Sequence, residues 1–177
     1  MRRILLLDDE ENVLAALSRS FRLIDHSGEL TVEKFTSAKA ALQRMSETVF
    51  DILIADYHMP EMDGVGFLRI AREMQPDAVR MMLSASAEFN TLLGAINDAE
   101  AFRFIAKPWT QQELEEAYKM ACERRDQIHE EHRLADIASV KQGKLTEQEA
   151  ELRRLEEQEP GITKVRWGKD GSVMLDE

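Results

Sequence analysis

The sequence predicts an α/β protein in which a doubly wound, five-stranded parallel sheet is followed by a smaller helical and β-hairpin extension. Short apolar runs alternate with helical stretches over the first two thirds of the chain, which is the pattern of successive βα units. Three of the apolar runs are almost uninterrupted, as in strands that helices cover on both faces. After residue 110 the alternation stops and a long charged helical pattern takes over.

The strands are expected where the apolar runs occur, each about five or six residues long. They are residues 4–8, 30–35, 52–56, 79–84 and 102–106. The second run, Leu30-Thr31-Val32-Glu33-Lys34-Phe35, is more polar than the others. We therefore expect it at an edge of the sheet, where one side of a strand meets solvent.

Four helical stretches connect these strands, at about residues 11–24, 37–47, 64–74 and 89–98. Ser37 is the expected N-cap of the second helix. Pro76 follows the third helix as a stop signal, because proline cannot continue a helix.

A fifth helix should begin near Thr110, which forms a capping-box pattern with Glu113, and it meets no breaker before Gly143. A compact domain needs only about the first half of such a helix. Beyond Asp126 the sequence is highly charged and its apolar positions are sparse. A second helical stretch, residues 146–159, repeats the capping-box pattern with Thr146 and Glu149.

This second stretch has too little apolar surface to be stable alone in water. It either pairs with a second copy of the chain or folds back on the long helix; a solvated single helix is the alternative. Residues 160–177 read as a β-hairpin around the turn Asp170-Gly171, with Trp167 packed on another element. The expected organisation is a domain at residues 1–125, a helical extension at 126–159 and a hairpin tail at 160–177.

Polar side chains stand where four of the predicted strands end. Asp8 and Asp9 follow the first run, Asp56 ends the third, Ser84 ends the fourth and Lys107 follows the fifth. The carboxyl ends of parallel strands lie at one edge of the sheet, where ligands bind in open α/β folds. We therefore expect these five side chains to converge on a single shallow pocket.

Three carboxylates within a few ångströms repel one another, and a hard divalent cation such as Mg²⁺ relieves that repulsion. A carboxylate beside such a cation, a lysine and a hydroxyl can accept a phosphoryl group. The alternative is that the aspartates are helix N-caps and Lys107 is a solvated surface residue. Each residue alone fits that alternative, but the whole set at successive strand ends favours the pocket.

Over about its first 125 residues the chain resembles the receiver domain of two-component response regulators, a flavodoxin-like fold. The resemblance rests on several motifs in combination: Asp8-Asp9, Asp56 with Met59-Pro60 and Asp63-Gly64, Ser84-Ala85, and Phe104 before Lys107-Pro108. It implies that Asp56 accepts a phosphoryl group from a histidine kinase or a phosphotransfer protein.

The resemblance also implies roles for the other residues. Asp9 is a direct Mg²⁺ ligand and Asp8 acts through water, while Asp56 and the backbone carbonyl of His58 complete the protein's ligands. Ser84 is then the switch hydroxyl, Phe104 the switch aromatic and Lys107 the partner of the phosphoryl oxygens, with a cis bond before Pro108. The His58 side chain either tunes the lifetime of the phosphoryl group or is an ordinary exposed loop histidine.

The composition excludes several other functions. A net charge of −11 argues against nucleic acid as a partner, since nucleic acid binds basic surfaces. The single cysteine, Cys122, cannot form an internal disulfide. The first apolar run is too short for a signal peptide or a membrane span, so we expect a cytoplasmic protein without membrane contact.

After residue 110 we find no catalytic constellation, so the protein is expected to be a phosphoacceptor and not an enzyme. Phosphorylation would change its association with a downstream protein target. A homodimer could form through the long helix or through the face of the fourth helix, fifth strand and fifth helix. Two alternatives remain: the receiver part of a longer regulator with a catalytic output domain beyond Glu177, or an adaptor with a vestigial pocket, against which the intact residue set argues.

Overall fold

The structure is a computed structural model of the whole chain, and it describes residues 1–25, 28–85, 101–143 and 145–158. Two sequence predictions lie outside these residues: the fourth helix, at residues 89–98, and the β-hairpin at residues 160–177. The helices within the described residues are α1 to α3, α5 and α6.

The sheet is five-stranded and wholly parallel, with the order β2-β1-β3-β4-β5. Its strands are β1 (Arg2–Leu7), β2 (Leu30–Phe35), β3 (Ile52–Asp56), β4 (Val79–Ala85) and β5 (Arg103–Lys107). The predicted fold class is confirmed, and each strand lies within two residues of its expected position. β2 is an edge strand, as its polar sequence predicted, because a strand with one solvated side tolerates Glu33 and Lys34.

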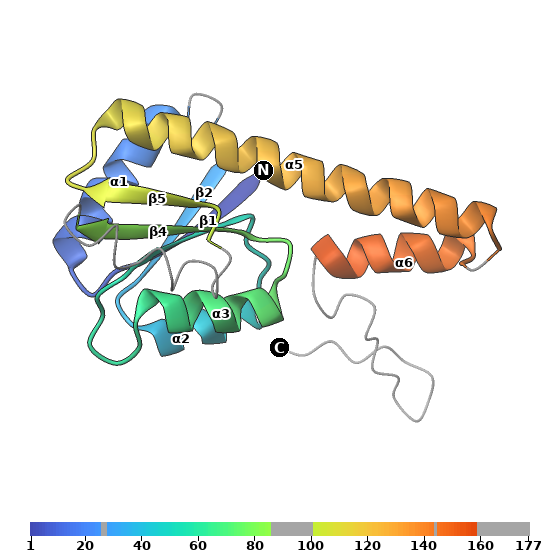
Figure 1. Cartoon of the computed structure of the whole chain (residues 1–177), viewed down its shortest axis with the longest axis horizontal. Coiled ribbons are helices and arrows are strands. Elements are labelled where there is room, and N and C mark those ends of the chain that lie inside the picture. Colours follow the sequence, from blue (N-terminus) through green and yellow to red (C-terminus); the bar gives the residue numbers. More distant parts are fainter. Residues whose placement is uncertain (26–27, 86–100, 144, 159–177) are drawn as a thin grey trace.

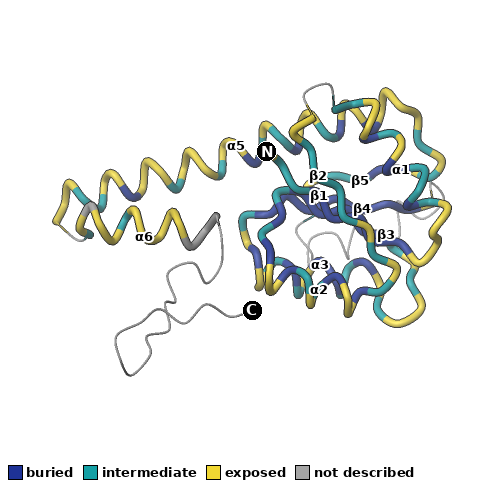
Figure 2. The backbone as a smooth tube through the Cα atoms, turned by 180° about the vertical axis from the view of Figure 1, so that it is seen from behind, coloured by how far each residue is buried: buried dark blue, intermediate teal, exposed yellow. Residues whose placement is uncertain are grey.

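Helices cover both faces of the sheet (Figure 1). α1 (Glu11–Ile24) and α5 (Gln111–Lys141) lie on one face, and α2 (Ala38–Met45) and α3 (Gly64–Met74) lie on the other. Side chains of β1 alternate between the two: Ile4 and Leu6 join the core under α1 and α5, and Leu5 and Leu7 join the core against α2 and α3. The central strands are the most deeply buried part of the chain (Figure 2).

The N-caps show how local sequence starts the helices. Thr110 accepts a hydrogen bond from the Glu113 backbone N–H at 3.2 Å, and the Glu113 carboxylate accepts one from the Thr110 backbone N–H at 2.7 Å. This is the predicted capping box. Ser37 occupies the N-cap position of α2, but its side chain makes no capping hydrogen bond.

The long helix changes character half-way along its length. Its first part buries Leu114, Ala117 and Ala121 against the sheet, whereas most residues after Asp126 are exposed and the helix projects beyond the sheet (Figures 1 and 2). Within the described residues no helix is both long enough and apolar enough to cross a membrane.

α6 (Glu147–Gln158) folds back along the projecting part of α5 (Figure 1). Thr146 and Glu149 form its capping box, with hydrogen bonds of 2.8 and 3.2 Å. Asp136 on α5 is largely buried and accepts a hydrogen bond from Arg153 on α6 at 3.2 Å. Of the arrangements that the sequence left open for this helix, the structure therefore has the folded-back one.

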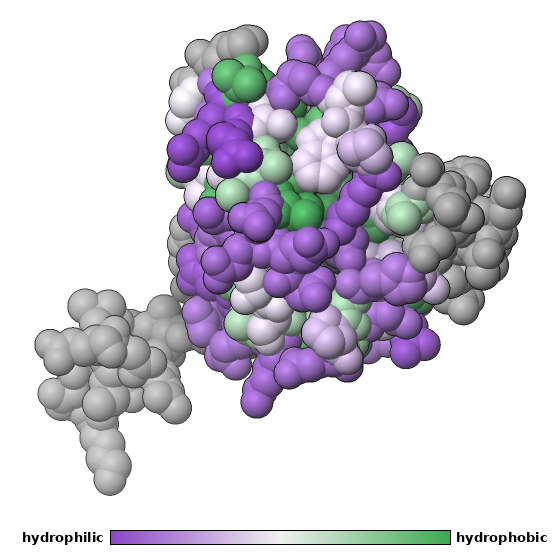
Figure 3. Space-filling model, turned by 90° about the vertical axis from the view of Figure 1, so that its left-hand side faces the viewer, coloured by the Kyte–Doolittle hydropathy of each residue, from purple (hydrophilic) through white to green (hydrophobic). Residues whose placement is uncertain are grey.

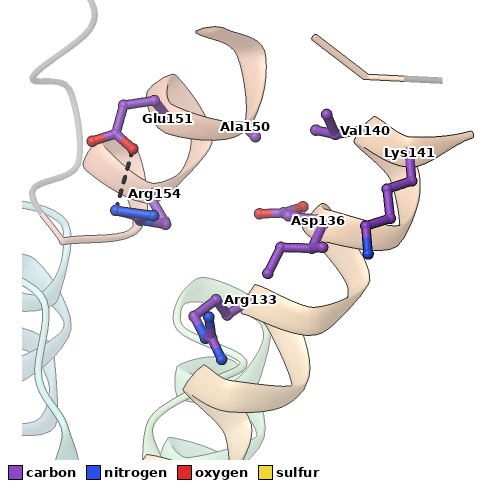
Figure 4. A pocket seen from close by; sticks show the side chains of 8 residues that line it. Arg133, Asp136, Val140, Lys141, Ala150, Glu151 and Arg154 are labelled. Carbon is purple, nitrogen blue, oxygen red and sulfur yellow. Dashed lines mark ion pairs between the residues drawn. The ribbon is translucent and has the colours of Figure 1, made fainter. Parts of the chain in front are cut away.

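A pocket of about 380 Å³ opens between the two helices, and Figure 4 shows residues that line it. Val140 and Ala150 contribute apolar surface, while Arg133, Glu151 and Arg154 bring charge. Glu151 and Arg154 form an ion pair at 3.2 Å on α6 itself. The helices therefore meet through a mixed polar and apolar surface and not through a continuous apolar seam.

An ion cluster at the amino-terminal edge of the sheet ties α5 to the strands. Arg125, only 2% exposed, donates from Nε to the Asp51 carboxylate at 3.2 Å, and that carboxylate also accepts the Arg3 backbone N–H at 2.8 Å. Arg2 donates to both carboxylate oxygens of Asp126, at 2.8 and 2.7 Å. This cluster fixes the direction in which α5 leaves the sheet.

Candidate functional site

The carboxyl ends of the strands bring the predicted site residues to one edge of the sheet. Asp8 directly follows β1, Asp56 ends β3, and Lys107 ends β5. Ser84, on β4, lies between them in register, since Asp56 is paired with Leu83 and Ser84 with Ala106. Figure 3 looks onto this edge, where hydrophilic surface surrounds scattered apolar patches.

Lys107 bridges two of the carboxylates. Its ammonium nitrogen lies 2.7 Å from an Asp8 oxygen and 2.5 Å from an Asp56 oxygen. Asp8 is fully buried and Asp56 is nearly so, while 22% of the Lys107 side chain remains exposed. Two buried negative charges thus share one partly accessible cation, and they depend on it for neutralisation.

The helix-cap alternative for these aspartates is wrong. The N-cap of α1 is Glu10 and that of α3 is Asp63, whose side chain accepts the Gly66 backbone N–H at 2.7 Å. Asp8 does accept the Glu10 backbone N–H at 2.9 Å, which helps to orient its carboxylate towards the pocket. Lys107 is likewise no solvated surface lysine, because both of its contacts are within the site.

Asp9 completes a group that could hold a metal ion. Oxygen atoms from Asp8, Asp9 and Asp56 lie within 4.8 Å of one another. Three carboxylates without soft ligands suit a hard, oxygen-preferring cation such as Mg²⁺. Asp9 is exposed, so a cation could approach from solvent while keeping water in its other positions.

The electrostatics of the site follow from burial and from the shared lysine. Burial raises the pKa of Asp56, and this effect outweighs the hydrogen bond from Lys107 and the other contacts that lower it. For Lys107, burial lowers the pKa, but the hydrogen bonds to Asp56 and Asp8 together raise it further, so the net shift is upward. Lys107 is therefore held as a cation, whereas the burial of Asp56 disfavours its charged form.

The three remaining predicted residues surround this centre. The Ser84 hydroxyl is buried and donates to the Ala85 carbonyl at 3.2 Å. Phe104 is half-buried and packs against the core under α2 and α3. His58 is exposed, and its ring lies edge-on to that of Tyr57, with the two ring centroids 4.6 Å apart. A hydrogen bond from the His58 backbone lowers the pKa of Asp56. The role of the His58 backbone carbonyl as a metal ligand stays a prediction. The predicted cis peptide bond between Lys107 and Pro108 is confirmed.

Gly64 supports the site in a way that the sequence did not reveal. A Cβ atom at this position would lie 2.2 Å from the backbone oxygen of Asp56, and the Gly64 backbone N–H donates to the Tyr57 carbonyl at 3.0 Å. Only a residue without a side chain allows α3 to begin this close to the end of β3. The Asp63-Gly64 pair was visible as a motif, but the close approach depends on tertiary structure.

Substituting Gly64 with alanine is expected to lower the free energy of unfolding by about 1–3 kcal/mol, the usual cost of forcing an atom into occupied space. Urea denaturation measures this cost. Gly28→Ala is the matched control: Gly28 has a φ of +71° but nothing within 4 Å of its added Cβ, so it reports backbone strain alone, about 1 kcal/mol. Equal losses in the two variants would show that the contact with Asp56 is unimportant.

Comparisons with known proteins decide the family. The sequence model of the response regulator receiver domain matches residues 4–119, which is well over half of the chain. The chain belongs to this family. Every predicted site residue of the receiver domain lies inside the matched segment.

Individual relatives agree. The receiver domain is 37% identical over 120 residues to the hydrogenase transcriptional regulatory protein HoxA of Bradyrhizobium diazoefficiens, covering 68% of this chain and 24% of that protein. It is 32% identical to the transcriptional regulatory protein PrrA of Mycobacterium leprae, covering 70% of this chain and 51% of PrrA. The matched segment thus spans about a quarter of the length of HoxA and about half of that of PrrA.

A solved structure has the same fold. The signal receiver domain of an HD domain-containing protein from Pseudomonas fluorescens superposes with a TM-score of 0.65 at 29% identity. The superposition covers 71% of this chain and 98% of that domain. The likeness therefore extends over the receiver domain and leaves out much of the rest of the chain.

Proposed function

We propose that this response regulator receiver is the phosphoacceptor of a two-component phosphorelay, and that Asp56 takes a phosphoryl group from a histidine kinase or a phosphotransfer protein. The observation that carries the proposal is the bridge of Lys107 between Asp56 and Asp8, two members of a cluster of three carboxylates that Asp9 completes. This arrangement holds a nucleophilic carboxylate next to a fixed cation, which in-line phosphoryl transfer requires.

In the transfer, an Asp56 oxygen forms a bond to phosphorus as the bond from phosphorus to the donor nitrogen breaks, and the departing imidazole keeps the electron pair and takes a proton from solvent. Lys107 moves from the Asp56 carboxylate onto the phosphoryl oxygens while Asp8 keeps hold of its ammonium group. Mg²⁺ bound by Asp8, Asp9, Asp56 and the His58 carbonyl would supply further positive charge for those oxygens.

The phosphorylated state would be read by neighbouring side chains. Ser84 donates its hydroxyl to the phosphoryl group and Phe104 moves with it, which alters the surface of β5 and α5. This surface then binds a downstream protein target or a second copy of the chain. In this role the protein accepts and loses a phosphoryl group and is not a turnover enzyme.

One specific observation favours a second reading, in which the chain is the receiver part of a longer regulator. The relatives HoxA and PrrA are about four and two times as long as the matched segment, and both are called transcriptional regulatory proteins. Under this reading the phosphoryl chemistry is unchanged, and α5 and α6 connect the receiver to an output region.

Incubation with acetyl phosphate and Mg²⁺, followed by intact-mass measurement, tests the phosphoacceptor proposal. Wild-type protein is expected to gain the mass of one phosphoryl group, and to gain none when EDTA replaces Mg²⁺. Asp56→Ala is expected to gain none, whereas Asp126→Ala, which removes an exposed aspartate at the opposite edge, should behave as wild type. An unmodified wild-type protein, or a modified Asp56→Ala, would refute the proposal.

A further inference from the structure

One face of the projecting part of α5 is uncovered and has a symmetric sequence. Glu130, Leu134, Ile137 and Lys141 follow one another at intervals of four, three and four residues, so they form one stripe along the helix. Leu134 is 53% exposed and Ile137 is 39% exposed, so both apolar side chains of the stripe remain accessible.

α6 leaves most of this stripe exposed, although Ile137 and Lys141 also line the pocket between the two helices. The side of α5 that meets α6 is marked by Asp136, which is largely buried and bound to Arg153. At about 100° of rotation per residue, Leu134 lies roughly 160° around the helix from Asp136. Ile137 lies about 100° from Asp136 and about 60° from Leu134, and it lines the pocket between the helices while remaining 39% exposed. Folding back therefore leaves Glu130 and Leu134 on the outer surface of α5, with Ile137 and Lys141 exposed at the edge of the α6 contact.

The charged residues at the two ends of the stripe favour one direction of pairing with a second α5 helix over the other. If a second α5 runs antiparallel across this face, a twofold axis between Ala135 and Asp136 places Leu134 of one copy against Ile137 of the other. The same axis places Glu130 against Lys141 at both ends, so two opposite-charge contacts flank the apolar centre. A parallel arrangement would instead place Glu130 against Glu130 and Lys141 against Lys141, which is repulsive.

We propose that this stripe is a self-association surface, on which the α5 helices of two copies of the chain pair antiparallel about a twofold axis. Such an isologous contact needs only one self-complementary patch. The axis lies between ten and eleven residues beyond Arg125, roughly 16 Å along the helix, so the two receiver domains extend from opposite ends of the pair. The contact does not depend on the chemistry of Asp56.

The charged residues are available for this contact. Glu130 binds Arg133 at 2.7 Å within its own helix, but both side chains are about half exposed, and such surface pairs are weak. Among the described residues, Lys141 forms no ion pair. Because only four apolar side chains meet, the pair is small by the standards of stable dimers and its formation should depend strongly on concentration.

Sedimentation velocity over a concentration series of the full chain tests the surface. Glu130→Lys and Lys141→Glu each replace two attractive contacts by repulsive ones, and each is expected to raise the dissociation constant roughly tenfold. A mixture of the two variants restores opposite charges at both ends and should associate as wild type does, which also shows that both variants are folded. Lys39→Glu on α2 makes the same change in net charge as Lys141→Glu, away from the stripe, and should have no effect.

Disulfide trapping tests the direction of pairing. In a Cys122→Ser background, a mixture of Leu134→Cys and Ile137→Cys chains is expected to form mixed disulfides faster than either variant alone forms its own. Faster trapping of the single variants would establish a parallel pair and overturn the proposal. A monomeric wild type at all concentrations, or equal association of Lys141→Glu and wild type, would overturn it as well.

Discussion

Replacing Lys107 with methionine is expected to lower the free energy of unfolding by about 3 kcal/mol in the absence of divalent cations, the cost of leaving buried charge without its partner. Lys107 is the cation between Asp8 and Asp56, at 2.7 and 2.5 Å, and its removal leaves two carboxylates facing each other in a buried pocket. Methionine keeps much of the length of the side chain, so the loss reports mainly charge. Urea denaturation in EDTA measures it.

Two further measurements separate this effect from ordinary damage to the fold. Mg²⁺ should restore much of the lost stability, because a cation at the three-carboxylate cluster takes over neutralisation. The rate of phosphorylation by acetyl phosphate should still fall about 100-fold, as when one charge-stabilising donor is removed from an active site. Lys39→Met on the exposed side of α2 is the control, and equal stability of the two variants would contradict the bridging role.

Replacing Asp56 with asparagine is expected to have the opposite effect on stability, raising the free energy of unfolding at pH 7 on the order of 1 kcal/mol, because it removes a carboxylate whose charged form is disfavoured chiefly by burial. The pKa of Asp56 is raised above 3.8 in the folded protein, chiefly by burial. The folded state therefore holds its proton more tightly than the unfolded state does, so stability falls as the pH rises from the unfolded to the folded pKa. Asparagine carries no such charge.

The pH dependence gives this prediction its control. The stability advantage of Asp56→Asn over wild type should be larger at pH 7 than near pH 4, because at the lower pH part of the wild-type Asp56 is already protonated. Urea denaturation at both pH values measures the difference. Asp126→Asn removes a carboxylate that is paired with Arg2 at the surface, and it should not be stabilising. An advantage that stayed constant or grew towards acid would contradict the raised pKa.

The sequence was sufficient to predict the pocket because its polar residues stand directly at the ends of the predicted strands. An apolar run followed by Asp8, another ended by Asp56 and a third followed by Lys107 place their side chains at one edge in any parallel sheet. The sequence could not predict the distances that make Lys107 a shared cation. Nor could it predict the upward shift of the Asp56 pKa that follows from burial. They depend on how deeply each carboxylate lies, which packing determines.

Arg125 and Gly64 are two further residues whose roles could not be predicted from the sequence. Arg125 appeared as one more residue with helical spacing, yet it is nearly fully buried and bound to Asp51, a residue 74 positions earlier. Gly64 appeared as part of a turn motif, yet its role is to let α3 approach the Asp56 carbonyl. Neither partner is near in sequence, so no local pattern could identify it.

By itself, therefore, the sequence determined the alternation of strands and helices, the parallel sheet, the capping boxes of α5 and α6 and the set of residues at the pocket. These features follow from local hydrogen bonding and from the period of apolar residues, which are written in neighbouring positions. Only the tertiary structure decided that α6 folds back along α5, that an ion cluster fixes where α5 leaves the sheet, and that Leu134 and Ile137 stay exposed. Those outcomes depend on which distant surfaces meet, and charged helices with sparse apolar residues leave several arrangements close in free energy.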